Sequence, residues 1–294
     1  MKIGLSRIII ISIAAFIFIW ILFFLSFYGI RKLTIDEFNK QQMIMAEQAE
    51  QGITGYMEHL EDDLEFLTTI DGTLDLNAEG RIIIQNFYRR NQKLIKTITH
   101  MDRNGRIVWT SPDNKKFRGA DISSQEHVKY LLREHKTSLS DIFPAVQGFM
   151  AIALHVPVFN NGRFYGSIAV LIDFSELSKI FIENIKIGPG GYAWMLSAGG
   201  KELYCPVPGH IGKSIYETSH MFPDVISMAE RMMRGEKGSA SYHYDLVKEQ
   251  YVGREKKHAS FTPVNYLTLT GQWLLQRLKN RFLRLWMVPG INLW

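Results

Sequence analysis

The stretch ALHVPVFNNGRFYGSIAVLIDFSEL, residues 153–177, decides the fold of this chain. Two runs rich in β-branched and aromatic residues, 149–158 and 163–173, flank the turn formed by Asn160, Asn161 and Gly162. Asn-Gly between two such runs indicates a β-hairpin, because both residues tolerate the left-handed backbone of a tight turn. A short helical segment follows at residues 175–184. The stretch therefore predicts two antiparallel strands that lead into a helix.

Outward from this stretch, the same pattern of hairpin, helix and strands occurs twice. On its N-terminal side we expect strands at residues 96–100, 106–111 and 138–143, and a helix at 124–135 with Ser123 or Ser124 as its N-cap. On its C-terminal side we expect strands at 191–197, 201–205, 238–244, 257–263 and 268–275, and a helix at 221–234. Two such units predict an α+β fold with two tandem antiparallel-sheet domains, at residues 70–185 and 186–275.

Residues 31–69 predict one long helix. They contain no proline, and apolar or small residues recur three or four positions apart, at Ile35, Phe38, Met45, Ala49, Ile53, Met57, Leu60, Leu64 and Leu67. Such a stripe packs either along the protein's own domains or against a second copy in a homodimer, and the sequence leaves both interpretations open. A second helix is expected at residues 78–93.

Residues 8–30 carry no charge and are long enough to cross ~30 Å of hydrocarbon as a helix. A cleaved signal peptide is the alternative, but its apolar core would be shorter, about 7–15 residues, and would end at a small-residue cleavage site. We therefore expect an uncleaved, single-pass span in the cell (inner) membrane. Residues 1–7 are too few to form a domain, so we place them in the cytoplasm and the folded part outside it.

Composition argues against several classes of function. The formal charge of +5 owes much to four cations near the C-terminus, Arg277, Lys279, Arg281 and Arg284, which argues against a nucleic-acid partner. The single Cys205 excludes an intrachain disulfide and a Cys-x-x-Cys zinc site. His127 and His135 are interpreted as surface or pocket positions rather than metal ligands. Because no catalytic or phosphate-binding motif occurs, we expect no catalytic residue, no metal site and no cofactor.

Five stretches resemble the double Cache sensor family, in which two PAS-like sheets lie along one long helix. They are THMDRNGRIVWTS (99–111), the stretch quoted first (153–177), GPGGYAWMLSAGGKELYCP (188–206), HIGKSI (210–215) and HASFTPV (258–264), in the family's order. The resemblance implies an extracytoplasmic sensor whose membrane-distal domain binds a small molecule, such as an organic acid, amino acid or amine. It also implies a homodimer through the long helix, and an output such as a histidine kinase, a diguanylate cyclase or a chemoreceptor signalling rod.

Five residues are candidates for a ligand site in the distal domain. Tyr130 and Arg133 are three apart and share a face of one expected helix, and Trp109 would supply an aromatic wall. His155 and Asp173 lie on the two strands of the first stretch. The resemblance implies that an acid at Asp173 holds a ligand amine, whereas a helix N-cap or a surface position is the alternative. The full arginine, tryptophan and tyrosine motif of the amino-acid-binding subfamily is not evident.

Residues 276–294 form a basic tail whose cations interrupt every apolar run, so it does not cross a bilayer. It is interpreted as the product of a truncated or frame-shifted sequence, as an amphipathic helix on the membrane, or as an ordinary terminal helix. On each of these interpretations we expect the chain to have no output module and, alone, to give no cytoplasmic response. The predicted function is a membrane-anchored sensor, not an enzyme. The alternative is a membrane protein with a degenerate pocket that acts by dimerisation or partner binding.

Overall fold

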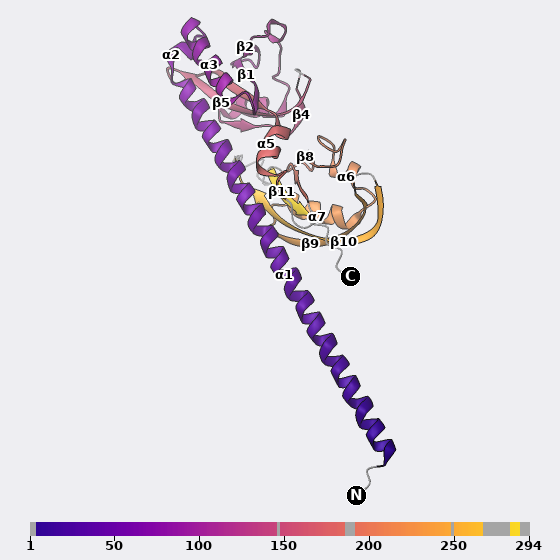
Figure 1. The fold of residues 1–294 in the computed structure, drawn as a ribbon. Helices are drawn as coiled ribbons and strands as arrows, with labels where there is room; N and C mark the ends of the chain where they lie inside the picture. Colours follow the sequence, from indigo (N-terminus) through magenta and orange to yellow (C-terminus); the bar gives the residue numbers. More distant parts are fainter. Residues whose placement is uncertain (1–3, 146–147, 186–191, 248–249, 267–282, 289–294) are drawn as a thin grey trace.

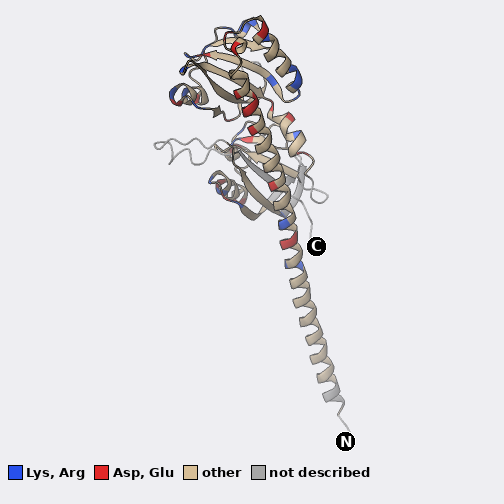
Figure 2. Cartoon of the chain, turned by 90° about the vertical axis from the view of Figure 1, so that its left-hand side faces the viewer, with Lys and Arg blue, Asp and Glu red and all other residues tan. Residues whose placement is uncertain are grey.

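The structure, a computed structural model, describes residues 4–145, 148–185, 192–247, 250–266 and 283–288. Its longest element is α1 (Leu5–Thr68), a 64-residue helix that joins the predicted span to the predicted long helix without a break. The N-terminal part of α1 projects far beyond the two domains (Figure 1), and its apolar side chains are exposed. This part is long and apolar enough to cross a membrane. Along the described part of the helix, Lys, Arg, Asp and Glu residues begin where it approaches the domains (Figure 2).

The C-terminal half of α1 packs along the protein's own domains. The predicted stripe is buried at Ala49, Ile53, Met57, Leu60, Leu64 and Leu67. The same residues belong to one hydrophobic core with the distal sheet and with Met195 and Val264 of the proximal one. Packing along its own domains, the first interpretation of the stripe, is therefore confirmed, while a seam between two copies stays a prediction.

The distal domain is built on a six-stranded antiparallel sheet. Its strands are β1 (Ile95–Asp102), β2 (Ile107–Ser111), β3 (Ser138–Leu139), β4 (Phe143–Pro144), β5 (Met150–Asn160) and β6 (Arg163–Ile172). The strand order is β2-β1-β6-β5-β3, with β4 paired to β5. Its helical segments are α2 (Asp71–Leu74), α3 (Ala78–Asn91), the 3-10 turn η1 (Lys115–Phe117), α4 (Glu126–Glu134) and α5 (Phe174–Phe181). The hairpin predicted around Asn160 to Gly162 is confirmed.

Alternation along β5 and β6 divides the distal sheet into two faces. Ile152, Leu154 and Val156 belong to the core shared with α1, together with their neighbours on β6. Ala153 and His155 have the opposite parity and line the space beneath α4. The start of α4 differs from expectation: Ser123 hydrogen-bonds Asp121 instead of capping the helix, and the helix begins at Glu126.

The proximal domain repeats this topology. Its strands are β7 (Tyr192–Leu196), β8 (Glu202–Tyr204), β9 (Gly238–Val247), β10 (Gln250–Val264) and β11 (Leu283–Val288), in the order β8-β7-β11-β10-β9. Helices α6 (Ile215–Thr218) and α7 (Pro223–Met233) accompany it, and α7 packs through Val225, Met228, Ala229 and Met232. In each sheet the first strand of the domain pairs with its last strand, β1 with β6 and β7 with β11. The prediction of two tandem antiparallel-sheet domains is therefore confirmed.

The basic tail supplies one strand of the proximal sheet. Residues 283–288 form β11, which pairs antiparallel with both β10 and β7. The helical interpretations of the tail are therefore wrong over these six residues, because the sheet needs a strand between β7 and β10. The strand expected at residues 268–275 lies outside the described residues.

Gly52 is the point where α5 meets α1. A Cβ added at Gly52 would lie 2.7 Å from Phe181 Cδ1, and the Phe181 and Tyr56 rings are 6.4 Å apart. We expect Gly52→Ala to lower the free energy of unfolding by about 1–3 kcal/mol, because the ring must move out of a packed site. A double-mutant cycle by urea denaturation checks this result. In a Phe181→Leu background the loss should shrink, and an unchanged loss would contradict the contact.

Candidate functional site

A hollow lies in the distal domain between α4 and the sheet. Its cavity volume is about 30 Å³, and the whole empty space that includes its opening to solvent is about 380 Å³. The small side chains of Ala153 and Ala169 leave this space free above the sheet, where larger residues would fill it. The hollow is lined by Thr99, Ile107, Ile122, Gln125, His127, Phe143, Ala153, His155, Ala169 and Leu171. An apolar wall with a few convergent polar groups is the usual composition of a small-molecule site.

Two imidazole rings dominate the polar part of this lining. The His127 and His155 rings lie 5.1 Å apart, and the Phe143 ring lies 5.5 Å from His127. His155 Nδ1 is 3.1 Å from Ser167 Oγ. His127 Nε2 is shielded from solvent and has no hydrogen-bond partner. A buried polar atom without a partner costs about 1–3 kcal/mol, so a ligand that pairs with it gains that much in return.

Both rings are neutral at pH 7. Burial lowers the pKa of His127 to about 4. Burial, and secondarily the nearby His127 ring, holds the pKa of His155 well below its ordinary value. Among the described residues, no charged side chain lines the hollow. The hollow therefore offers neutral donors and acceptors, and two groups that a bound anion would help to protonate.

Of the five predicted ligand residues, only His155 lines this hollow. Trp109 is 2% exposed and packs in the core on the α1 side of the sheet, edge-on to His100 at 6.3 Å. Trp109 therefore does not line this hollow, because it pairs with His100 and shares that residue's face of the sheet. Tyr130 is half-buried on α4, where burial raises the pKa of its hydroxyl.

Arg133 and Asp173 have local partners. Arg133 is exposed, and its Nε donates to Glu134 Oε1 at 2.6 Å. Asp173 caps α5 by accepting a hydrogen bond from the Ser175 amide at 3.0 Å, and it lies 3.8 Å from Lys96 Nζ. The capping role left open by the sequence is thus the one that Asp173 has in this structure. The sequence left His127 as a surface or pocket position and did not include it among the ligand residues, because only the folded chain brings its ring to within 5.1 Å of His155.

A broader concavity lies at the membrane-distal tip, between α2 and the ends of β1 and β6, with about 1060 Å³ of open space. Arg103 and Asn104 on its rim are exposed. We favour the hollow beneath α4 on its polar groups, because the His127 and His155 rings lie 5.1 Å apart there and His127 Nε2 has no hydrogen-bond partner.

Comparison with known proteins gives the fold a context. Residues 55–173 match the family described as HK/GC/Chemotaxis protein-like, sensor domain. The chain is similar in structure to an extracellular ligand-binding receptor from Desulfohalobium retbaense (20% identity, TM-score 0.61), covering 85% of this chain and 40% of that one. This chain thus spans well under half of that receptor. The comparison with curated proteins finds no match.

Two chemoreceptor domains match over nearly their whole length. The ligand-binding domain of a Pseudomonas aeruginosa amino acid chemoreceptor, solved with GABA, is 18% identical with a TM-score of 0.60, covering 85% of this chain and 98% of that chain. The ligand-binding domain of a Pseudomonas fluorescens chemoreceptor, solved with L-isoleucine, is 14% identical with a TM-score of 0.63, covering 89% and 96%. The predicted α+β fold, a long N-terminal helix followed by antiparallel sheets, is confirmed, and residues 55–173, mostly in the distal domain, are the part that matches the sensor family.

Proposed function

We propose that this chain is the ligand-sensing part of a membrane-anchored receptor. In this proposal α1 is the anchor in the cell membrane, both domains lie outside the cytoplasm, and the hollow beneath α4 is the ligand site. The observation that carries the proposal is the buried, unpaired Nε2 of His127, a residue that lines the hollow in the domain matched by the sensor family. The similarity to extracellular ligand-binding domains supports the same role.

The chemistry of the hollow favours a small organic acid. An amine would need a buried acid, but Asp173 is engaged as a helix cap and does not line the hollow. A carboxylate, in contrast, accepts hydrogen bonds from protonated imidazole, and His127 and His155 can both take up a proton. Thr99 and Gln125 add neutral hydrogen-bonding groups. Amino acids, the ligands of the two chemoreceptor domains, are the next candidates.

Strand β5 connects the proposed site to the anchor helix. His155 faces the hollow, while its neighbours Leu154 and Val156 belong to the core that includes α1. A ligand that shifts His155 therefore shifts residues in contact with the α1 core. We propose that α1 also pairs with a second copy, a role supported by the exposed apolar side chains of Ile44 and Phe66. Ligand binding would then change how the two α1 helices pack against each other.

A thermal-shift screen of the purified full-length chain in detergent tests this function. We expect small organic acids to raise the unfolding temperature, since a ligand at 100 times its Kd adds about 2.7 kcal/mol. Arg133→Ala should keep the shift, because that side chain lies exposed outside the hollow. His127→Phe should lose it. A screen of organic acids, amino acids and amines without any stabilising compound would contradict the proposal and favour a degenerate pocket.

A further inference from the structure

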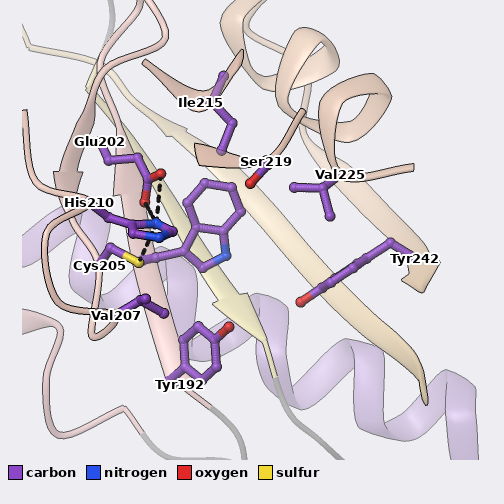
Figure 3. A pocket seen from close by; sticks show the side chains of 10 residues that line it. Tyr192, Glu202, Cys205, Val207, His210, Ile215, Ser219, Val225 and Tyr242 are labelled. Atoms are coloured by element: carbon purple, nitrogen blue, oxygen red, sulfur yellow. Dashed lines mark hydrogen bonds and ion pairs between the residues drawn. The ribbon is translucent and has the colours of Figure 1, made fainter. Parts of the chain in front are cut away.

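The proximal domain contains a second hollow, with a cluster of three metal-ligating side chains on its wall (Figure 3). Glu202 belongs to β8, and Cys205 and His210 come from the loop that follows it. His210 Nδ1 lies 3.1 and 3.3 Å from the two Glu202 carboxylate oxygens and 3.8 Å from Cys205 Sγ. Within the described parts of the chain, this is the one group of three such residues whose ligand atoms all lie within 4.8 Å of one another.

The backbone of the loop fixes this arrangement. Gly212 N donates to Glu202 O at 2.7 Å, and Glu202 N donates to Lys213 O at 2.9 Å, so the loop returns to pair with the strand it left. Gly209 and Gly212 have φ of +77° and +83°, which allows the chain to reverse in this short distance. His210, between the two glycines, is thereby held against the carboxylate. The cluster thus rests on hydrogen-bonded backbone rather than on mobile surface side chains.

The environment of the cluster is built for a cation. Glu202 is 1% exposed, and Thr218 donates a hydrogen bond to its carboxylate. A buried carboxylate needs positive charge or several donors to offset its lost hydration. The walls of the hollow include the aromatic residues Tyr192, Trp194 and Tyr242, and Figure 3 shows Tyr242 across the hollow from the three ligand groups. One side of the cluster therefore faces open space, where a fourth ligand can bind.

The donor set and its spacing select the metal. Sulfur, imidazole nitrogen and carboxylate oxygen are the three donor types of zinc sites, at about 2.0–2.3 Å from the ion. Tetrahedral ligands at those bond lengths lie roughly 3.3–3.8 Å from one another. The two measured separations around His210, 3.1 and 3.8 Å, already lie close to this range. Calcium and magnesium would instead require a shell of oxygen atoms.

We propose that Glu202, Cys205 and His210 bind a divalent transition-metal ion of the zinc class, with a fourth position open to the proximal hollow. Three protein ligands and one open position are the arrangement in which zinc accepts an exogenous ligand. This site is independent of the organic-acid site, which lies in the other domain and shares no residue with it. The receptor would then have a second input. The expectation that the chain has no metal site is set aside by this proposal, because the three ligands do not form a Cys-x-x-Cys motif.

Cobalt substitution of the reduced, metal-free full-length chain in detergent tests the proposal. We expect one equivalent of Co²⁺ to give a thiolate-to-cobalt charge-transfer band and strong visible bands of tetrahedral geometry, all bleached by Zn²⁺. Since Cys205 is the single cysteine, Cys205→Ser should abolish the charge-transfer band. His210→Gln should weaken binding by more than about tenfold, because even outer-shell partners of a metal cost 10–100-fold.

His220→Gln is the matched control. His220 is an exposed histidine of the same domain whose Nδ1 bonds only to its own turn, at Glu217 O, 3.0 Å away. It should leave both the affinity and the spectrum unchanged. The absence of a thiolate band in the folded wild-type chain, or equal affinity in His210→Gln and His220→Gln, would overturn the proposal. In that case the three groups would be a hydrogen-bonded cluster that holds the loop on β8.

Discussion

Replacing Gly166 by alanine should strongly destabilise the distal domain. Gly166 lies on β6 with φ of +150°, and a Cβ at this position would lie 2.0 Å from Met101 O on the neighbouring strand. No side-chain rotation relieves this clash, because the atom in the way belongs to the backbone of β1. We expect Gly166→Ala to lower the free energy of unfolding by about 4 kcal/mol, the upper end of what single substitutions cause. Urea denaturation followed by tryptophan fluorescence measures the change.

Gly162→Ala provides the control for this prediction. Gly162 also has a positive φ, of +75°, but a Cβ there meets nothing within 4 Å. It should cost only about 1–2 kcal/mol for the left-handed backbone. If the two variants lose the same stability, the close approach of β1 and β6 at Gly166 is not as described.

Mild acid should destabilise the distal domain strongly. Burial lowers the pKa of His100 to about 4 in the folded chain, against 6.5 for an unperturbed histidine. Between these two values the unfolded state binds a proton that the folded state does not, so the free energy of unfolding falls as pH drops below 6.5. From pH 7 to pH 5 the loss is about 2 kcal/mol for one such histidine. His127, whose pKa burial also lowers to about 4, contributes a similar loss.

Urea denaturation at pH 7 and pH 5 measures this effect. His100→Leu should reduce the loss by about 2 kcal/mol, the part that His100 causes, while the buried His127 and His155 keep their own contributions. His220→Gln, which changes an exposed ring, should leave the loss unchanged. A wild-type chain equally stable at both pH values would show that these rings are hydrated in the folded state.

The fold could be predicted from local signals, and the reason is visible in particular residues. Asn161 and Gly162 have φ of +49° and +75°. These are the left-handed conformations that Asn-Gly favours, so this pair of residues was enough to predict the hairpin. The buried apolar stripe on α1 could be predicted because residues three or four positions apart share one face of a helix. The tail could not be predicted, since its cations concealed β11, whose place in the sheet depends on β7 and β10, some 90 and 20 residues earlier in the chain.

The ligand site was less predictable, for a physical reason. Alternation along a strand assigns residues to two faces but does not say which face is packed and which is hollow. Of the predicted ligand residues, His155 lies on the face with the hollow, while Trp109 belongs to the filled face. His127 lies on a different element, and only the three-dimensional arrangement brings it to His155. The metal-ligating cluster was missed for the same reason, because the turn at Gly209 and Gly212 brings His210 back to Glu202.

Titration calorimetry on a pair of hollow-filling variants tests the central claim, that the hollow beneath α4 binds the ligand. Ala169→Leu fills that hollow from the sheet, and Ser219→Val fills the proximal one, where Ser219 points into the space (Figure 3). The titrant is an organic acid found in the thermal-shift screen. We expect one binding site per chain in wild type and in Ser219→Val, and no binding in folded Ala169→Leu. Binding that survives in Ala169→Leu and disappears in Ser219→Val would contradict it.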